Sequence, residues 1–138
     1  MPISTLRLAV DSDVVVRFPA PDHLDGLQNV VHSDVVVYDS EYDRSDLVHT
    51  RIQLIAEVAS EDTVDMDSGI KRVLYAHAGI PAYLIVQFDR TWEGIDRVEE
   101  YRLDWSGSCY VPHRVHRTAL VLDTPVTLAV TFESLDSP

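Results

Sequence analysis

Three side chains in the central part of the chain have the types and spacing that metal-assisted hydrolysis of a phosphate ester requires. Asp34 opens a Val-rich stretch, Glu57 lies late in the next apolar stretch, and Lys71 follows in a segment with helical spacing. Two carboxylates on neighbouring strands can converge on one hard cation such as Mg²⁺, which prefers oxygen ligands and keeps several waters. A nearby ammonium group can stabilise phosphate charge or position the attacking water.

The same residues also have purely structural interpretations. Asp34 could cap the start of a strand, Glu57 could lie at the rim of a sheet, and Lys71 could pair with Asp67 one helical turn earlier. Lys71 is the only lysine beside ten arginines, and an exposed helix pair would be served equally well by arginine. Spacing alone leaves both interpretations open.

The segments around these residues predict an α/β fold, a mixed sheet with one main helix and a β-rich C-terminal part. Ile70, Val73 and Ala78 belong to an apolar stripe at helical spacing, which predicts a helix over 66–78 that ends at Gly79. A hairpin or one bent strand is expected at 6–18. Further strands are expected at 33–39, 51–60 and 82–88, an edge strand at 99–104, and short strands near 108–111, 119–122 and 126–130.

The composition excludes several classes of protein. The 138 residues, typical of one domain, carry 23 acidic and 11 basic side chains, and the net charge of −12 argues against a general nucleic-acid binder. The longest wholly apolar runs have four or five residues, too few for a helix that spans a membrane. Cys109 is the only cysteine and the first residues lack the pattern of a secretion signal, so we expect a cytoplasmic protein.

Other common signals of chemistry are absent from the sequence. It has no Gly-rich phosphate loop, no dinucleotide-binding fingerprint and no HExxH metal motif. His113 and His116 lie three residues apart, but Pro112 and the nearby valines predict an extended chain, in which such positions face opposite ways. We therefore expect solvated histidines there rather than a metal site.

The stretch from Ser33 to Asp89 resembles the Uma-type restriction-endonuclease family of the PD-(D/E)xK nuclease superfamily. The resemblance rests on an Asp before a Val-rich strand, a Glu-Val pair followed closely by Ser, and then Asp, Lys and Tyr on a helix before a Gly-hydrophobic-Pro turn. A later strand and a Gly-x-x-Tyr also fit. The matching segments are SDVVVYD (33–39), LIAEVAS (54–60), DSGIKRVLYAHAGIPAYLIVQFD (67–89), VEEYRLD (98–104) and 107–110.

The resemblance implies hydrolysis of DNA phosphodiester bonds by water activated on Mg²⁺ or Mn²⁺. Asp34 and Glu57 match the metal-binding acids, and the backbone carbonyl of Val58 would complete the protein's share of the metal shell. Lys71 matches the catalytic lysine, and Asp67 matches a supporting acidic position on the helix.

Departures from the family pattern suggest an alternative. The family has N-terminal helices before its first hairpin, whereas this chain starts almost at that hairpin, so we expect one domain over 1–138 that lacks those helices. An uncovered sheet would favour a homodimer or a partner protein. The alternative is a catalytically inactive family member that serves as a protein-binding or dimerisation module.

Overall fold

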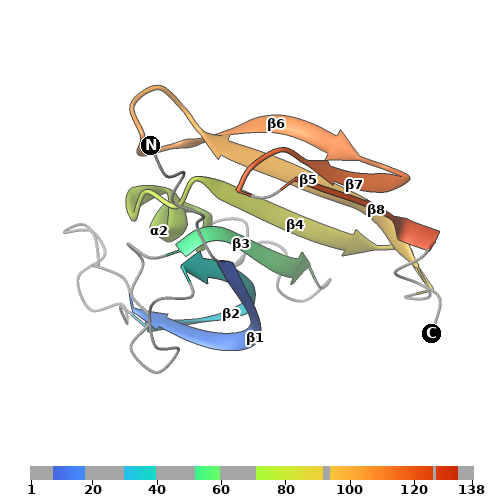
Figure 1. The fold of residues 1–138 in the computed structure, drawn as a ribbon, viewed down its shortest axis with the longest axis horizontal. Helices are drawn as coiled ribbons and strands as arrows, with labels where there is room; N and C mark the ends of the chain where they lie inside the picture. Colours follow the sequence, from blue (N-terminus) through green and yellow to red (C-terminus); the bar gives the residue numbers. More distant parts are fainter. Residues whose placement is uncertain are drawn as a thin grey trace, which may run out of the picture.

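The computed structural model describes residues 8–17, 30–39, 52–59, 71–91, 94–125 and 127–133. These ranges hold a six-stranded sheet, a two-stranded ribbon and the short helix α2, Arg72–His77 (Figure 1). The arrangement confirms the predicted α/β class with a mixed sheet and a β-rich C-terminal part. The sheet contains β1 (Leu8–Arg17), β2 (Val30–Asp39), β3 (Ile52–Ala59), β4 (Ala82–Phe88), β5 (Ile95–Leu103) and β6 (Tyr110–His116), and the ribbon contains β7 (Ala119–Leu122) and β8 (Leu128–Thr131).

The six strands of the sheet lie side by side in the order of the sequence. β3 and β4 run parallel, whereas every other neighbouring pair in the sheet is antiparallel. Because a tight turn cannot join parallel neighbours, the chain between β3 and β4 must cross over one face of the sheet. That connection contains α2, so the strands expected at 51–60 and 82–88 and the helix expected between them form one strand–helix–strand unit.

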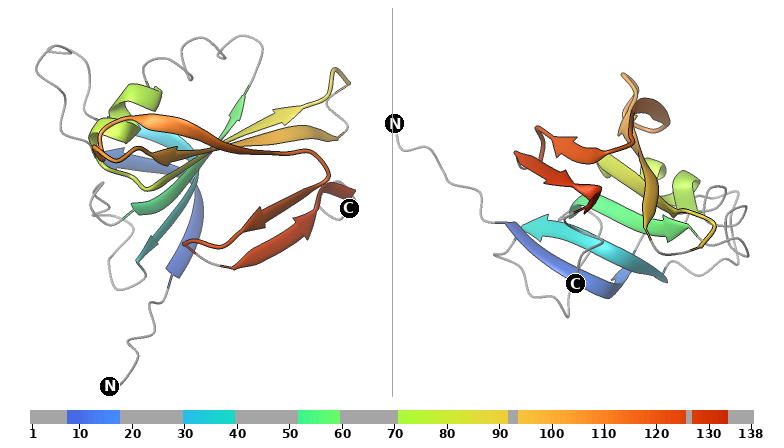
Figure 2. Two further views of the ribbon diagram at one scale, coloured as in Figure 1. Left: turned by 90° about the horizontal axis from the view of Figure 1, so that it is seen from above. Right: turned by 90° about the vertical axis from the view of Figure 1, so that its right-hand side faces the viewer.

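α2 and the β7–β8 ribbon cover opposite faces of the sheet (Figure 2). On the α2 face, the ring of Tyr75 meets the ring of Tyr83 edge-on, with the centroids 5.4 Å apart. On the other face, Leu122 and Phe132 pack in one buried cluster with Leu84 of β4. Over the central strands, each face of the sheet is therefore covered by a segment of the chain itself.

Two expectations about the strands are settled by the pairing. β1 is one continuous strand from Leu8 to Arg17, so the hairpin alternative for 6–18 is wrong. The expected edge strand at 99–104 belongs to β5, which pairs with β4 on one side and with β6 on the other, so it is not an edge strand. Pro112 within β6 weakens the strand signal of that segment, which concealed the pairing from sequence reasoning.

The C-terminal end of the predicted helix 66–78 is confirmed. The backbone of α2 continues to Ala78 and then turns at Gly79, whose φ of +80° is a conformation that glycine adopts easily. The predicted start of the helix, and Asp67 with it, lies outside the described residues. No helix in the described part of the chain is long and apolar enough to cross a membrane.

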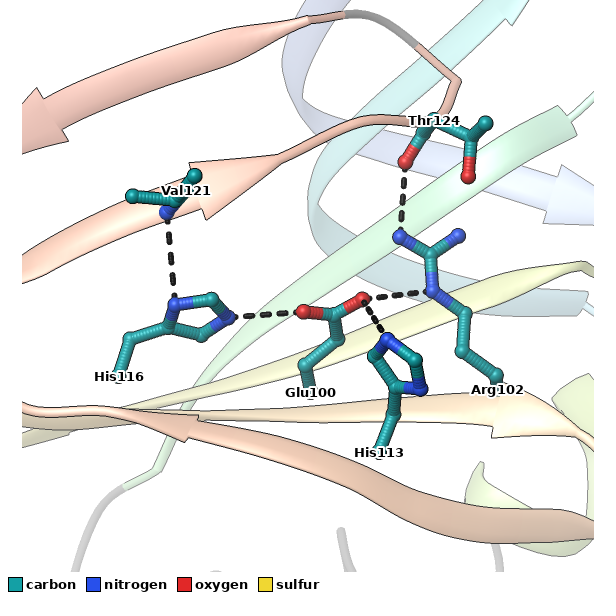
Figure 3. A network of polar contacts seen from close by, with 6 residues as sticks. All are labelled: Glu100, Arg102, His113, His116, Val121 and Thr124. Atoms are coloured by element: carbon teal, nitrogen blue, oxygen red, sulfur yellow. Dashed lines mark hydrogen bonds and ion pairs between the residues drawn. The ribbon is translucent and has the colours of Figure 1, made fainter.

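A bulge in β6 changes where its two histidines point. The β5–β6 register shifts between Glu100 and Tyr101, and the extra residue on β6 is His113. As a result, His116 Nε2 lies 2.8 Å from Glu100 Oε1, and His113 Nε2 lies 3.9 Å from Glu100 Oε2 (Figure 3). The expectation of two solvated histidines is therefore wrong, because His116 is buried and only His113 is exposed.

Glu100 connects the sheet to the β7 segment of the ribbon (Figure 3). Arg102 Nε donates to Glu100 Oε2 at 2.7 Å, and Arg102 Nη2 donates to the carbonyl of Thr124 at 2.8 Å. The Val121 amide donates to His116 Nδ1 at 3.4 Å. Burial alone would raise the pKa of Glu100, but the hydrogen bonds from His116 and Arg102 outweigh it and hold the pKa below its ordinary value.

Replacing Glu100 by Gln should destabilise the protein at neutral pH. The change leaves the largely buried Arg102 without its charged partner, which costs about 3 kcal/mol in comparable buried pairs. Because folding lowers the pKa of Glu100, its contribution is complete above the unfolded pKa of 4.5 and is lost as the pH falls below that value. Urea unfolding at several pH values measures the difference.

Asp123→Asn is the matched control, since Asp123 is exposed and lines the same pocket as Glu100. This variant should stay within about 0.5 kcal/mol of the original protein. Equal unfolding free energies for Glu100→Gln and Asp123→Asn at pH 7 would show that Glu100 does not connect the two layers.

Candidate active site

Asp34 and Glu57 lie side by side where β2 and β3 separate. The paired stretch of the two strands ends at Val35 opposite Ala56, so the next amides are available to side chains. The Val58 amide donates to Asp34 Oδ2 at 2.8 Å, and the Asp34 amide points to Glu57 Oε2 at 3.4 Å. Each carboxylate is thus held by the backbone of the neighbouring strand.

The α2 segment brings a cation and a phenol to the same carboxylate. Lys71 Nζ lies 3.5 Å from Glu57 Oε1, and the Tyr75 hydroxyl donates a hydrogen bond to that oxygen. Lys71 and Tyr75 are four residues apart and therefore share one face of the helix. The Ser33 hydroxyl lies 3.2 Å from the Tyr75 hydroxyl and extends the chain of contacts to β2.

Burial gives Glu57 an unusual protonation equilibrium. Its side chain is 1% exposed, and burial raises its pKa to about 7, with the neighbouring Asp34 adding to the rise. The hydrogen bond from Tyr75 and the charge of Lys71 act in the opposite direction but do not cancel the effect of burial. Burial and the charge of Glu57 also raise the pKa of Tyr75 above its ordinary value, so this phenol remains a donor.

The structure brings together the three residues that the sequence analysis selected. Asp34, Glu57 and Lys71 meet at the N-terminal end of α2, and Glu57 does not lie at an exposed rim. Asp34 lies inside β2 and not at the start of the strand. The role of the Val58 carbonyl stays a prediction, although the Val58 amide bonds Asp34.

Tyr75 is the functional candidate that residue-by-residue sequence reasoning left out. A tyrosine on the apolar side of a helix is usually a core residue, and Tyr75 is indeed fully buried. The available signal was its position one helical turn after Lys71. A tyrosine placed there must find a partner for its hydroxyl, and Glu57 is that partner.

The oxygen donors of this site fit a hard divalent cation. Asp34 is exposed and can be reached from solvent, and the Glu57 carboxylate beside it would supply a second oxygen ligand. In the described ranges no three His, Cys, Asp or Glu side chains gather to hold an ion. One or two carboxylates with retained waters are the arrangement typical of Mg²⁺.

Tyr75→Phe should raise the pKa of Glu57 further above about 7. The variant removes a hydrogen bond that favours the charged carboxylate, and such bonds contribute about 1.5–3 kcal/mol, or at least one pKa unit. Carbon-13 NMR of the glutamate carboxyl groups measures the shift. Tyr83→Phe, which alters a neighbouring buried ring, is the control, and equal values for the two variants would contradict the assignment of Tyr75.

The comparisons with known proteins agree with this geometry. The model of the Uma2 family, described as Putative restriction endonuclease, matches residues 2–136, nearly the whole chain. A search of curated proteins gives no match. The matched region includes the adjacent acids, the lysine and the strand–helix–strand unit that positions them, and the chain belongs to the Uma2 family.

Proposed function

We propose that the chain is an endonuclease that hydrolyses DNA phosphodiester bonds with Mg²⁺ or Mn²⁺. The observation that carries the proposal is the convergence of Asp34, Lys71 and Tyr75 on the buried carboxylate of Glu57. Membership of a restriction-endonuclease family supports nuclease activity at the family level. The cytoplasm is the proposed location, since the single exposed cysteine, Cys109, suits a reducing compartment.

Each residue has a distinct role in this proposal. Asp34, Glu57 and the carbonyl of Val58 would hold the cation, which supplies Lewis acidity and lowers the pKa of bound water. Lys71 would donate to a phosphate oxygen as negative charge develops there. Tyr75 fixes the orientation of Glu57 through its hydrogen bond. Asp67, which lies outside the described residues, is proposed as a supporting acid on the same helix.

One observation favours the alternative of an inactive binding module. The net charge of −12 opposes the approach of DNA. The charge is uneven, however, because residues 1–70 hold 14 acidic and four basic side chains, while residues 71–138 hold nine and seven. The second half, which carries Lys71, therefore repels a phosphate backbone far less than the first half does.

Mn²⁺ should bind at one site per chain, with an affinity that depends on pH. Glu57 must be deprotonated to serve as a ligand, so the affinity should fall by up to about tenfold per pH unit below its pKa of about 7. Isothermal titration calorimetry measures the affinity. Asp34→Asn or Glu57→Gln should abolish binding, with Asp123→Asn as the control, and unchanged binding in both site variants would exclude the metal site.

Lys71→Met and Lys71→Arg should both remove most Mn²⁺-dependent cleavage of DNA. Lysine is a compact charge with three donors, and the planar fork of arginine cannot occupy the same position. Gel assays with supercoiled and linear DNA measure cleavage, and thermal unfolding checks the fold. Arg114→Met is the control, since Arg114 is an exposed cation on the ribbon side of the sheet.

Two outcomes of this experiment separate the candidate functions. Cleavage that persists in Lys71→Met would contradict the role assigned to Lys71. A protein that cleaves no DNA with either metal would favour the inactive binding module.

A homodimer, or a complex with a partner protein, is the proposed assembly. The support is exposed apolar surface in the described residues, with Val111 and Val115 on the outer strand β6 and Trp105 97% exposed beside it. The predicted lack of the family's N-terminal helices, which first suggested a partner, stays a prediction. Light scattering should give twice the 15.6 kDa of one chain, and a monomer mass at the highest concentration reached would contradict the homodimer.

A further inference from the structure

A second set of polar side chains lies on the same face of the sheet as Glu57. The register places Glu57 opposite Ile85 and Ile85 opposite Glu99, so one apolar residue separates the two acids. In the next row Gln87 pairs with Arg97. Neighbouring strands are about 4.8 Å apart, so β5 lies about 10 Å from β3 on the α2 side of the sheet.

Glu99 is held by three donors and orients its neighbours. Arg97 Nε donates to Glu99 Oε2 at 3.3 Å, and the Gln87 amide donates to the same oxygen. The Tyr101 hydroxyl donates to Oε1 at 2.7 Å, and its ring carries the Arg72 guanidinium 4.4 Å from the centroid. Because its donors engage both carboxylate oxygens, Glu99 acts as a support for Arg97.

The guanidinium of Arg97 has a fixed partner at its Nε edge and a partner that a ligand can replace at Nη1. Glu99, which is 21% exposed, holds the Nε edge of the guanidinium. Arg97 Nη1 bonds Asp96 Oδ2 at 2.8 Å, but the Asp96 side chain is 46% exposed. Ion pairs in such exposed positions are weak and are readily exchanged, so a phosphate could replace Asp96. The planar guanidinium can then meet two phosphate oxygens at once.

The distribution of charge favours one path along which DNA can approach the site. β1 and β2 together hold four acidic residues and one arginine, so a DNA strand is repelled from the β1–β2 side of Glu57. Lys71, Arg72 and Arg97 belong to the nearly balanced second half, and all three contact side chains on the α2 face of β3 or β5. The path on which a DNA strand meets the least electrostatic repulsion therefore runs from Glu57 across β4 to β5.

We propose that the DNA backbone leaves the Glu57 site across β4 and that Arg97 binds a phosphate flanking the bond to be cut. Glu99 and Tyr101 are positioning residues, which hold the guanidinium in the orientation that meets the strand. This inference rests on the proposed nuclease function, but it concerns binding and can be tested without cleavage.

The test measures the affinity for a fluorescein-labelled DNA duplex by anisotropy over a series of salt concentrations, with Ca²⁺ in place of Mg²⁺. Arg97→Gln should weaken binding about tenfold and reduce the salt slope by about one. Arg97→Lys, which keeps the charge but loses the planar fork, should weaken binding while the slope stays unchanged. Arg114→Gln, on the opposite face, is the control and should change neither quantity.

The two acids beside Arg97 provide the sharper comparison. Each of Glu99→Gln and Asp96→Asn removes one negative charge, so simple electrostatics predicts tighter DNA binding for both. The proposed roles predict opposite results: Glu99→Gln weakens binding because Arg97 loses its support, and Asp96→Asn tightens binding because a competitor of the phosphate is removed. Thermal unfolding confirms that each variant is folded.

The outcomes separate this inference from the function on which it rests. If the original protein binds DNA and Arg97→Gln loses no more affinity than Arg114→Gln, the assignment of Arg97 is overturned and the nuclease proposal survives. Tighter binding by Glu99→Gln overturns the positioning role. If the original protein binds no DNA even at the lowest salt, both the inference and the nuclease proposal fall.

Discussion

The rest of the site depends on a carboxylate that the sheet and α2 remove from water. Glu57 is 1% exposed, and transfer of an unpaired charge to such a place would cost several kcal/mol. The compensating groups come from separate elements: the Asp34 amide from β2, and the lysine and tyrosine of the α2 segment. Moving either of these elements would remove at least one partner of the charge, so the chemistry of one side chain constrains how the elements assemble.

The partners of Glu57 compensate only in part for the burial of its charge, so its protonation state changes near neutral pH. The raised pKa of Glu57, about 7, shows that its partners do not offset the effect of burial. The adjacent Asp34 adds a second negative charge and raises that pKa further. A divalent cation at the proposed metal site would relieve the repulsion between the two acids and would take oxygen ligands from both.

The sequence was sufficient to predict the part of the site that follows from local periodicity. Alternation along 51–60 places Glu57 on one face with Ile55, whereas Lys71 on the following helix was selected by the family resemblance. The position of Asp34 was expected on a neighbouring strand because its Val-rich stretch is typical of a buried strand. The strands and the helix that carry these residues follow from the periods of two and 3.6, but spacing alone left the convergence of the three side chains open.

The features that sequence reasoning missed depend on tertiary contacts. His116 reaches Glu100 because β6 has one extra residue at a bulge, and the local sequence of that segment does not predict a bulge. The hydrogen bond of Tyr75 was not predicted because an aromatic residue on an apolar helix face usually packs in a core. Here Tyr75 packs in the core and also donates to Glu57. The support of Arg97 by Glu99 involves donors from two strands, whose register no single segment encodes.

Glu57 and Glu100 show that the partners of a buried acid, and not burial alone, decide the direction in which its pKa shifts. Both side chains are almost fully buried, at 1% and 3% exposure, on opposite faces of one sheet. Glu100 meets a guanidinium at 2.7 Å and an imidazole at 2.8 Å, so its pKa falls and its charge is already neutralised. Glu57 has one ammonium at 3.5 Å and an acidic neighbour, so its pKa rises. A carboxylate that has a close guanidinium and a second fixed donor is stabilised in its charged form, whereas one that is buried and short of positive charge is destabilised in that form.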